Sequence, residues 1–236
     1  MKFRKAEPER RNRLERYLKR WGPGCPSPPE EATWAENVQP SFLKKQGLIP
    51  GHVFLDLGCG WLRGTRPLID YLDEGNFYGV DISQANIERA KETTMHVTKH
   101  KPNLAVENGF EIGRTWPDVQ FDFILAASLF THIYPSDLRE CLLQVSKVLK
   151  GKFFATIFKD NTLSIYGGWC GSCLDHSRDH AGMSRDATFE RLDFCYNSDW
   201  ICKAGSEFGL SVKEVGLTEI GQFMLEISHA RQLADC

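Results

Sequence analysis

Long hydrophobic runs are missing from this chain of 236 residues, and no apolar stretch approaches the roughly 18 residues that a membrane-spanning helix needs. The first 20 residues, MKFRKAEPERRNRLERYLKR, lack the apolar core of a secretory signal peptide. Internal repeats and low-complexity tracts are also lacking. These absences argue against a membrane-bound or secreted protein, and we expect a cytoplasmic one with no membrane contact.

The chain also has little net charge, formally −2 at pH 7, but this charge is unevenly spread. Residues 1–20 hold nine Lys and Arg against three Asp and Glu, so the remainder is acidic. A basic segment of this kind is either an arm for an anionic partner such as RNA or a solvated helix that pairs with the acidic body. We favour the helix.

Cysteine, in contrast, is plentiful, with eight residues in the chain. An even number invites a disulfide framework, but a chain of this length can bury a full hydrophobic core without covalent links. Because a secretory signal is also lacking, we expect reduced thiols.

Apolar strands alternate with helical patterns from residue 52 onward. We expect strands at 52–58, 76–83, 103–109, 121–128, 152–158, 210–216 and 221–229. We expect helices at 8–21, 30–46, 64–72, 83–100, 135–149 and 198–208, with Ser136 as a possible cap. This alternation predicts an α/β fold with a doubly wound, Rossmann-like parallel sheet. Residues 1–50 would form an N-terminal helical cap, and the polar, glycine-rich segment 159–196 a lid inserted into the main domain, 51–236.

Residues 54–64, FLDLGCGWLRG, combine a buried strand, a glycine turn and a predicted helix start. Backbone amides at such a helix start can face a ligand. The dinucleotide fingerprint G-x-G-x-x-G is absent, because Arg63 stands where its last glycine would be. Asp81 ends the second strand, 21 residues after Gly60. A carboxylate there can accept two hydrogen bonds from a ribose diol.

Four stretches in this order, FLDLGCGWLRG, FYGVDIS, FDFILAASLFTHI and VLKGKFFATIF, resemble the class I S-adenosylmethionine (SAM)-dependent methyltransferases. More narrowly, they are similar to bacterial enzymes with the motif L-D-[IL]-G-C-G-x-L-R-G, which act largely on small molecules. The resemblance covers about residues 52–229. It implies a seven-stranded sheet with an antiparallel last strand, SAM as the cofactor, and methyl transfer to an oxygen or nitrogen of a small molecule.

The resemblance also implies the cofactor contacts. The methionine end of SAM would lie against the backbone of the first motif, with Arg63 at its carboxylate and Asp56 beneath it. The adenosine end would lie near Asp81 at the ribose and Ile82 against the adenine. The full implied set is Asp56, Gly58, Cys59, Gly60, Arg63, Asp81, Ile82, Asn108, Gly109, and the stretch from Ala126 through Ala127 to Ser128.

Methyl transfer is an in-line displacement, so the protein must align two reactants and exclude water. His132 follows the fourth strand and is our candidate for a base toward the acceptor. The alternative is a histidine that fixes the start of the next helix by hydrogen bonds. Tyr134 is a weaker candidate for acceptor contact, or a packing residue.

The segment 159–196 contains the stretch WCGSCLDHSRDH. Its residues Cys170, Cys173, His176 and His180 are of the types that commonly coordinate zinc. The gap between the cysteines and histidines leaves no room for a hairpin, so we predict no metal. We expect His176 and His180 to contact the acceptor instead. The N-terminal cap would add an aromatic wall of Tyr17, Trp21 and Trp34.

Two other functions remain open from the sequence. An RNA or tRNA methyltransferase would use the basic N-terminal arm to hold phosphate. A non-catalytic SAM-binding scaffold would bind the cofactor without turnover. The sequence predicts neither the acceptor nor the oligomeric state.

Overall fold

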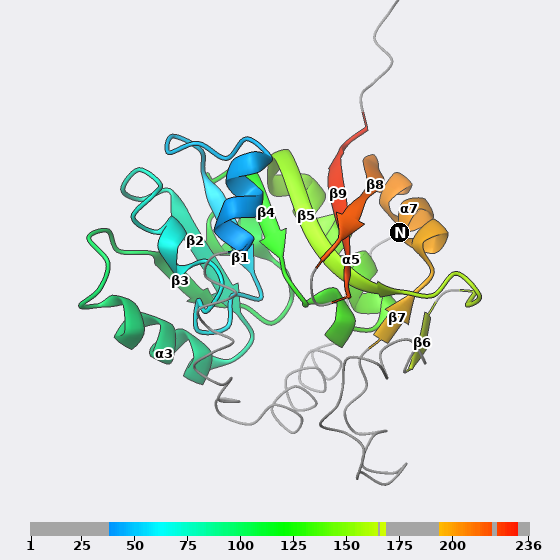
Figure 1. Cartoon of the computed structure of the whole chain (residues 1–236), viewed down its shortest axis with the longest axis horizontal. Coiled ribbons are helices and arrows are strands. Elements are labelled where there is room, and N and C mark those ends of the chain that lie inside the picture. The colour runs from blue at the N-terminus through cyan, green and yellow to red at the C-terminus, as the bar shows by residue number, and fades with distance from the viewer. Residues whose placement is uncertain (1–37, 165, 169–193, 219–220, 231–236) are drawn as a thin grey trace, which may run out of the picture. The chain divides into compact units, whose positions relative to one another are not determined.

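The computed structural model describes residues 38–164, 166–168, 194–218 and 221–230 (Figure 1). Contacts divide the chain into two units, residues 1–123 and 124–236, and strand β4 (Phe121–Ala126) contributes to both.

The first unit is built on parallel strands in the order β3-β2-β1-β4. They are β1 (Phe54–Leu57), β2 (Phe77–Asp81), β3 (Asn103–Val106) and the first half of β4. All four residues of β1 are buried, which explains why its sequence is a continuous apolar run broken only by Asp56. The carboxyl ends of β1 and β2 lie in register, with Leu57 opposite Val80, so the turns that follow them start at one edge.

The first unit also contains helices. A helix spans residues 38–45, and α3 (Gln84–Thr94) buries Ile87, Ala90 and Thr94. The Ser83 hydroxyl accepts the backbone N–H of Asn86 and caps α3, so the predicted helix start is confirmed. The helix ends six residues earlier than the predicted boundary at residue 100. A single helical turn, α4 (Ile112–Thr115), was not predicted.

The predicted helix over residues 64–72 is wrong. The structure has only a 3₁₀ turn, η1 (Arg66–Leu68), at this place. Pro67 lies inside it, and proline removes a backbone donor and disfavours helical geometry in the residue before it.

In the second unit the strand order is β4-β5-β7-β6, with β9 paired with β5 and β8 paired with β9. Strand β9 (Phe223–His229) runs antiparallel to both β5 (Leu149–Lys159) and β8 (Leu210–Leu217), between which it lies in Figure 1. Strands β6 (Tyr166–Gly168) and β7 (Phe194–Tyr196) form a further antiparallel pair, and β7 extends the sheet beside β5. Both fall in the segment expected to be a loop, so these two strands were missed.

The helices of the second unit are η2 (Phe130–His132), α5 (Pro135–Val148) and α7 (Ser198–Ser206). Helix α5 begins as predicted, but the expected cap Ser136 is wrong, because Tyr134 occupies the cap position and Pro135 opens the helix. The Asn197 side chain accepts the Trp200 N–H and caps α7.

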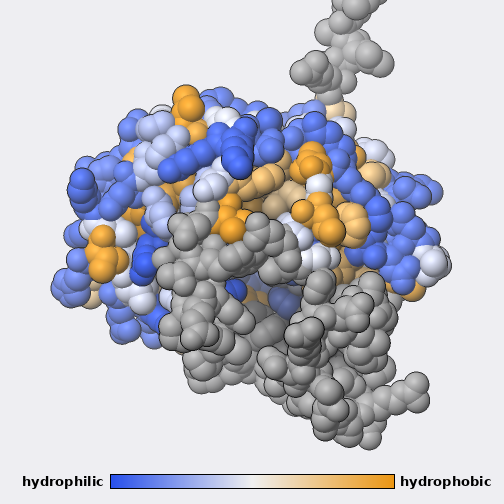
Figure 2. Space-filling model, viewed as in Figure 1, coloured by the Kyte–Doolittle hydropathy of each residue, from blue (hydrophilic) through white to orange (hydrophobic). Residues whose placement is uncertain are grey.

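The predicted fold class is confirmed: a mostly parallel, doubly wound sheet with an antiparallel last strand, to which β6 and β7 are added. Hydrophilic residues cover most of the described surface visible in Figure 2, and hydrophobic residues interrupt it in small groups. Among the described residues, none of the helices has the length and hydrophobicity needed to cross a membrane.

Candidate functional site

The glycine turn after β1 is tied to the end of β2. The N–H groups of Gly58 and Cys59 donate to the Val80 carbonyl at 2.8 and 2.9 Å, and Gly60 N–H donates to Asp81 Oδ2 at 2.9 Å. Gly58 and Gly60 adopt φ values of 79° and 54°, which favour glycine. These amides therefore fix the turn itself, and the expected helix start with ligand-facing amides is not formed. What Gly60 offers a ligand is close backbone approach, because a Cβ there would have no neighbour within 4 Å.

Asp81 is 6% exposed and accepts hydrogen bonds on both oxygens. Besides the Gly60 amide on Oδ2, Oδ1 accepts the Ser83 N–H at 2.8 Å and Asn86 Nδ2 at 3.1 Å. Burial raises the pKa of Asp81, and these bonds act in the opposite direction. Since a carboxylate offers about four acceptor positions, three protein bonds leave room for about one more. A ribose diol would bind with one hydroxyl or displace the Asn86 amide.

Asp56 lies within β1 and is also buried, with Oδ2 accepting the Thr65 hydroxyl. The pKa of Asp56 is raised from 3.8 to about 7. Burial is the main cause, the Thr65 hydrogen bond opposes it, and the nearby charge of Asp81 adds to it. An acid with this pKa is poised to ionise near neutral pH when a cationic group approaches.

Cys59 packs inward, where its Sγ would lie 3.2 Å from a Cβ added to Gly79. Burial, with the charges of Asp56 and Asp81, raises the pKa of the Cys59 thiol well above its usual range. The thiol is therefore a poor nucleophile. Glycine at position 79 is needed because a side chain there would collide with Cys59 and Leu104.

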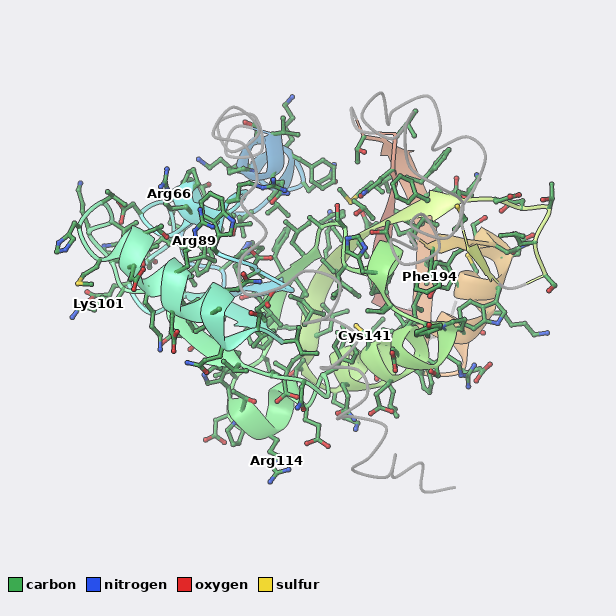
Figure 3. All side chains as sticks on the ribbon, turned by 90° about the horizontal axis from the view of Figure 1, so that it is seen from below. Arg66, Arg89, Lys101, Arg114, Cys141 and Phe194 are labelled. Carbon is green, nitrogen blue, oxygen red and sulfur yellow. The ribbon has the colours of Figure 1, made fainter. Side chains whose placement is uncertain are left out.

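Three further predicted residues, Arg63, Ile82 and Asn108, are half-buried. The neighbouring Trp61 was not predicted. Its ring lies 4.4 Å from the guanidinium of Arg89, which extends from α3 (Figure 3). This cation–π contact joins the glycine turn to the helix that follows β2.

After β3, Gly109 is buried and its N–H donates to Glu107 Oε1 at 2.6 Å. Glu107 was not among the predicted residues, because a carboxylate one position past a strand end has no distinguishing sequence pattern.

In the second unit, the end of β4 has an unusual backbone. Ser128 has a φ of 58°, which is uncommon for a non-glycine residue. Its N–H donates to Thr156 Oγ1 at 2.7 Å, its Oγ lies 3.1 and 3.0 Å from Gln222 Oε1 and Nε2, and its carbonyl accepts the Thr131 hydroxyl at 2.7 Å. Thr156 and Gln222 are themselves buried. This cluster of four polar residues fixes the strained turn that leads from β4, through the half-buried Ala127, into η2.

His132 is the last residue of η2 and is half-buried. Next to it, the Ile133 carbonyl accepts the hydroxyl of the buried Tyr196. Tyr134 packs its ring on Phe194 with a centroid distance of 4.8 Å. The structure thus brings β7 against the segment that carries His132, and Tyr134 has a packing partner there.

The remaining predicted residues lie outside the described part of the chain: Tyr17, Trp21, Trp34, Cys170, Cys173, His176 and His180. Among the described residues, no group of three or more His, Cys, Asp and Glu side chains could hold a metal ion.

Comparison with known proteins shows what this chain is similar to. Residues 55–152 match the family model described as a methyltransferase domain. Over 121 residues the chain is 32% identical to the probable methyltransferase ltbC of Aspergillus luteorubrus, covering 49% of this chain and 41% of that protein. The chain thus spans less than half the length of this curated relative.

Solved structures share the fold of this chain. Magnesium protoporphyrin IX methyltransferase (ChlM) from Synechocystis PCC 6803 with bound S-adenosylhomocysteine (SAH) has a TM-score of 0.61 at 15% identity, covering 91% of this chain and 93% of that one. PH0226 from Pyrococcus horikoshii OT3 has a TM-score of 0.59 at 19% identity, covering 86% of this chain and 92% of that one. The glycopeptide N-methyltransferase MtfA complexed with SAM has a TM-score of 0.60 at 14% identity, covering 84% of this chain and 93% of that one. At these identities the likeness shows the fold alone.

Proposed function

We propose that this protein is a SAM-dependent methyltransferase that transfers a methyl group to an oxygen or nitrogen of a small molecule. The observation that carries the proposal is the buried Asp81 carboxylate at the end of β2, bonded to the Gly60 amide of the preceding turn. A ribose hydroxyl needs a fixed acceptor beside a close backbone approach, and these two residues supply both.

Asp56 supports the same ligand at its other end. SAM carries an ammonium and a sulfonium, and a buried carboxyl group with a pKa of about 7 gains charge when a cation binds beside it. Asp56 would therefore ionise as the methionine part of SAM enters, while Arg63 is the proposed partner of the SAM carboxylate.

The reaction itself needs alignment and a dry site. The bond between the methyl carbon and the SAM sulfur breaks as the acceptor oxygen or nitrogen attacks, and SAH leaves with the electron pair of that bond. The acceptor proton goes to a base, for which we propose His132, or to water. The cap residues Tyr17, Trp21 and Trp34 and the residues His176 and His180 of segment 159–196 are proposed to contact the acceptor.

A small-molecule acceptor is supported by two of the structural neighbours, a magnesium protoporphyrin IX methyltransferase and a glycopeptide N-methyltransferase. The acidic body of the chain outside residues 1–20 also disfavours a nucleic-acid substrate.

The deciding experiment is calorimetry of the full chain with SAM, SAH and a nicotinamide dinucleotide, followed by transfer of a labelled methyl group to a panel of small molecules and to tRNA. We expect binding of SAM and SAH only, and label on a small molecule. Dinucleotide binding without SAM binding would refute the cofactor assignment. Label on tRNA with steep salt dependence would indicate the RNA enzyme, and tight SAM binding with no turnover on any acceptor would indicate the scaffold.

A further inference from the structure

The glycine turn after β1 contains a bulky residue in a backbone conformation that favours glycine. Leu62 has a φ of 66°, and its side chain is fully buried. Gly58 and Gly60 adopt the same region without a steric penalty, but at Leu62 the Cβ makes it unfavourable. Such a conformation persists only where the surroundings hold it, so the turn needs restraints beyond its own hydrogen bonds.

Trp61, between Gly60 and Leu62, is restrained from outside the turn. The guanidinium of Arg89 (Figure 3) lies 4.4 Å from the centre of the Trp61 ring, and both residues are half-buried. Tryptophan is the best aromatic partner for a cation, and the attraction is stronger when the pair is partly removed from water. Arg89 therefore holds the one residue that separates Gly60 from the strained Leu62.

Arg89 and the proposed ribose acceptor belong to one continuous stretch of chain. Helix α3 starts three residues after Asp81, and Ser83 caps it. One turn before Arg89 on the same face of this helix, the Asn86 side chain donates to Asp81 Oδ1 at 3.1 Å. Arg89 holds the residue that follows Gly60, the glycine whose N–H donates to Asp81 Oδ2 at 2.9 Å. The same helix therefore restrains both sides of the place where the turn and the carboxylate meet.

We propose that Arg89 is a positioning residue for the cofactor and acts through Trp61. With the guanidinium over the ring, the turn keeps Leu62 in its strained conformation and Gly60 beside the Asp81 carboxylate. Without it, rotation of the Leu62 backbone toward ordinary φ values would move Gly60 away from Asp81 and disturb the proposed ribose site. In this role Arg89 does not touch the cofactor. This inference rests on the proposed binding of SAM.

Calorimetry of the full chain with SAH tests the role of Arg89. We expect Arg89→Gln, which keeps a polar side chain but removes the charge, to weaken SAH binding by about fivefold, the factor that corresponds to one partly buried cation–π contact. Arg89→Lys keeps a cation near the ring and should retain most of the affinity. Wild-type affinity in Arg89→Gln would overturn the inference.

A double-mutant cycle shows whether Arg89 acts through Trp61. In a Trp61→Leu background, which offers no aromatic face, Arg89→Gln should weaken SAH binding by less than about twofold, because the contact that it removes is already lost. An undiminished loss in that background would show that Arg89 reaches the cofactor by another route, and the inference would be wrong.

Lys44→Gln is the matched control. The Lys44 ammonium lies 3.8 Å from the centre of the Tyr71 ring, so this variant removes a cation–π contact of the same kind from a pair outside the glycine turn. Urea denaturation of both variants measures what each contact contributes to stability. Lys44→Gln should leave SAH affinity at the wild-type level. Equal losses of affinity in Lys44→Gln and Arg89→Gln would show a general structural effect and contradict the proposed role.

Trp61→Phe provides the result if Arg89→Gln fails to fold. Phenylalanine is a weaker partner for a cation than tryptophan, so SAH affinity should fall by about twofold, and an unchanged affinity would contradict us. If the wild-type protein binds neither SAH nor SAM, the proposed function fails and this inference with it. That outcome is distinct from an unchanged affinity in the variants of a protein that binds both.

Discussion

The backbone N–H of Gly60 donates a 2.9 Å hydrogen bond to Asp81 Oδ2, across 21 residues of sequence. The turn after β1 and the end of β2 are therefore one structural element. A change at Asp81 acts on a proposed ligand and on the glycine turn together. This dual role has to be separated when the site is tested.

Asp81→Asn should weaken SAM binding by about 1–3 kcal/mol, because it replaces charge-assisted bonds to the ribose with neutral ones. Asp81→Ala should weaken it at least as much, since it also releases the Gly60 amide. Calorimetry measures both. Asp70→Asn is the control, because Asp70 is an exposed aspartate whose Oδ1 likewise accepts two backbone amides, those of Lys99 and His100. Wild-type affinity in Asp81→Asn would end the ribose assignment.

Much of this element was predictable from the sequence, and the reason is local. A buried strand, a glycine turn and an acid at the next strand end follow from patterns a few residues long, and so does the Ser83 cap of α3. The partners Thr156 and Gln222 were not predictable. They reach Ser128 across 28 and 94 residues, and no local pattern encodes a contact of that span.

Two other differences also have physical causes. The apolar spacing of residues 64–72 resembles a helix, yet Pro67 and the left-handed Leu62 before it leave only isolated turns. The sequence of segment 159–196 predicts a polar loop, because β6 and β7 have only three residues each. Strands this short give no recognisable alternation of apolar and polar residues.

Asp56 should make stability depend on pH. Its pKa is about 7 in the folded state against 3.8 in the unfolded chain, so between these values the folded state binds more protons. Stability contributed by Asp56 is therefore greatest at low pH and falls as pH rises toward 7, by up to about 4 kcal/mol.

Urea denaturation of the wild type and Asp56→Asn from pH 4 to pH 8 measures this effect. The free energy of unfolding of the variant, minus that of the wild type, should rise across the window and level off above it. Parallel curves for the two proteins would show that Asp56 titrates normally. SAM affinity of the wild type should increase with pH through the same window, because the ionised carboxylate is the form that favours a cation.

The segment WCGSCLDHSRDH is expected to hold no metal. Elemental analysis of protein purified without chelator should find well under one zinc per chain. Stoichiometric zinc that disappears in Cys173→Ser would reverse this expectation and make the segment a metal-organised element.

His132→Ala should lower turnover by about 10²-fold if His132 takes the acceptor proton, while SAM affinity stays unchanged. The measurement is kcat/KM on the acceptor found in the panel, together with calorimetry of SAM binding. His96→Ala, at an exposed position of the chain, is the control. Turnover near the wild-type level would leave His132 a structural residue.

At position 128, we expect the glycine variant to be more stable than the alanine variant, which is the reverse of the usual order. At ordinary positions alanine is more stable than glycine by about 0.5–1 kcal/mol, because glycine loses more backbone freedom on folding. At a φ of 58° a Cβ is strained and glycine is not, so Ser128→Gly should be more stable than Ser128→Ala. Both variants lose the hydroxyl contact with Gln222, so their difference isolates the backbone. Ser146, within α5, is the control site, at which the alanine variant should be more stable than the glycine variant.

Thr156 stabilises the strained turn at Ser128 by accepting the Ser128 N–H. Thr156→Val keeps the volume but removes the acceptor of the Ser128 N–H, which should cost about 1–3 kcal/mol of unfolding free energy. The strained turn leads directly into η2 and His132, so Thr156→Val should also lower kcat while the KM for SAM changes little. Ser128→Gly in the Thr156→Val background should recover part of the stability, because glycine can adopt other backbone angles in which its N–H finds a new acceptor. Strictly additive effects of the two substitutions would show that Thr156 and the Ser128 backbone are not coupled.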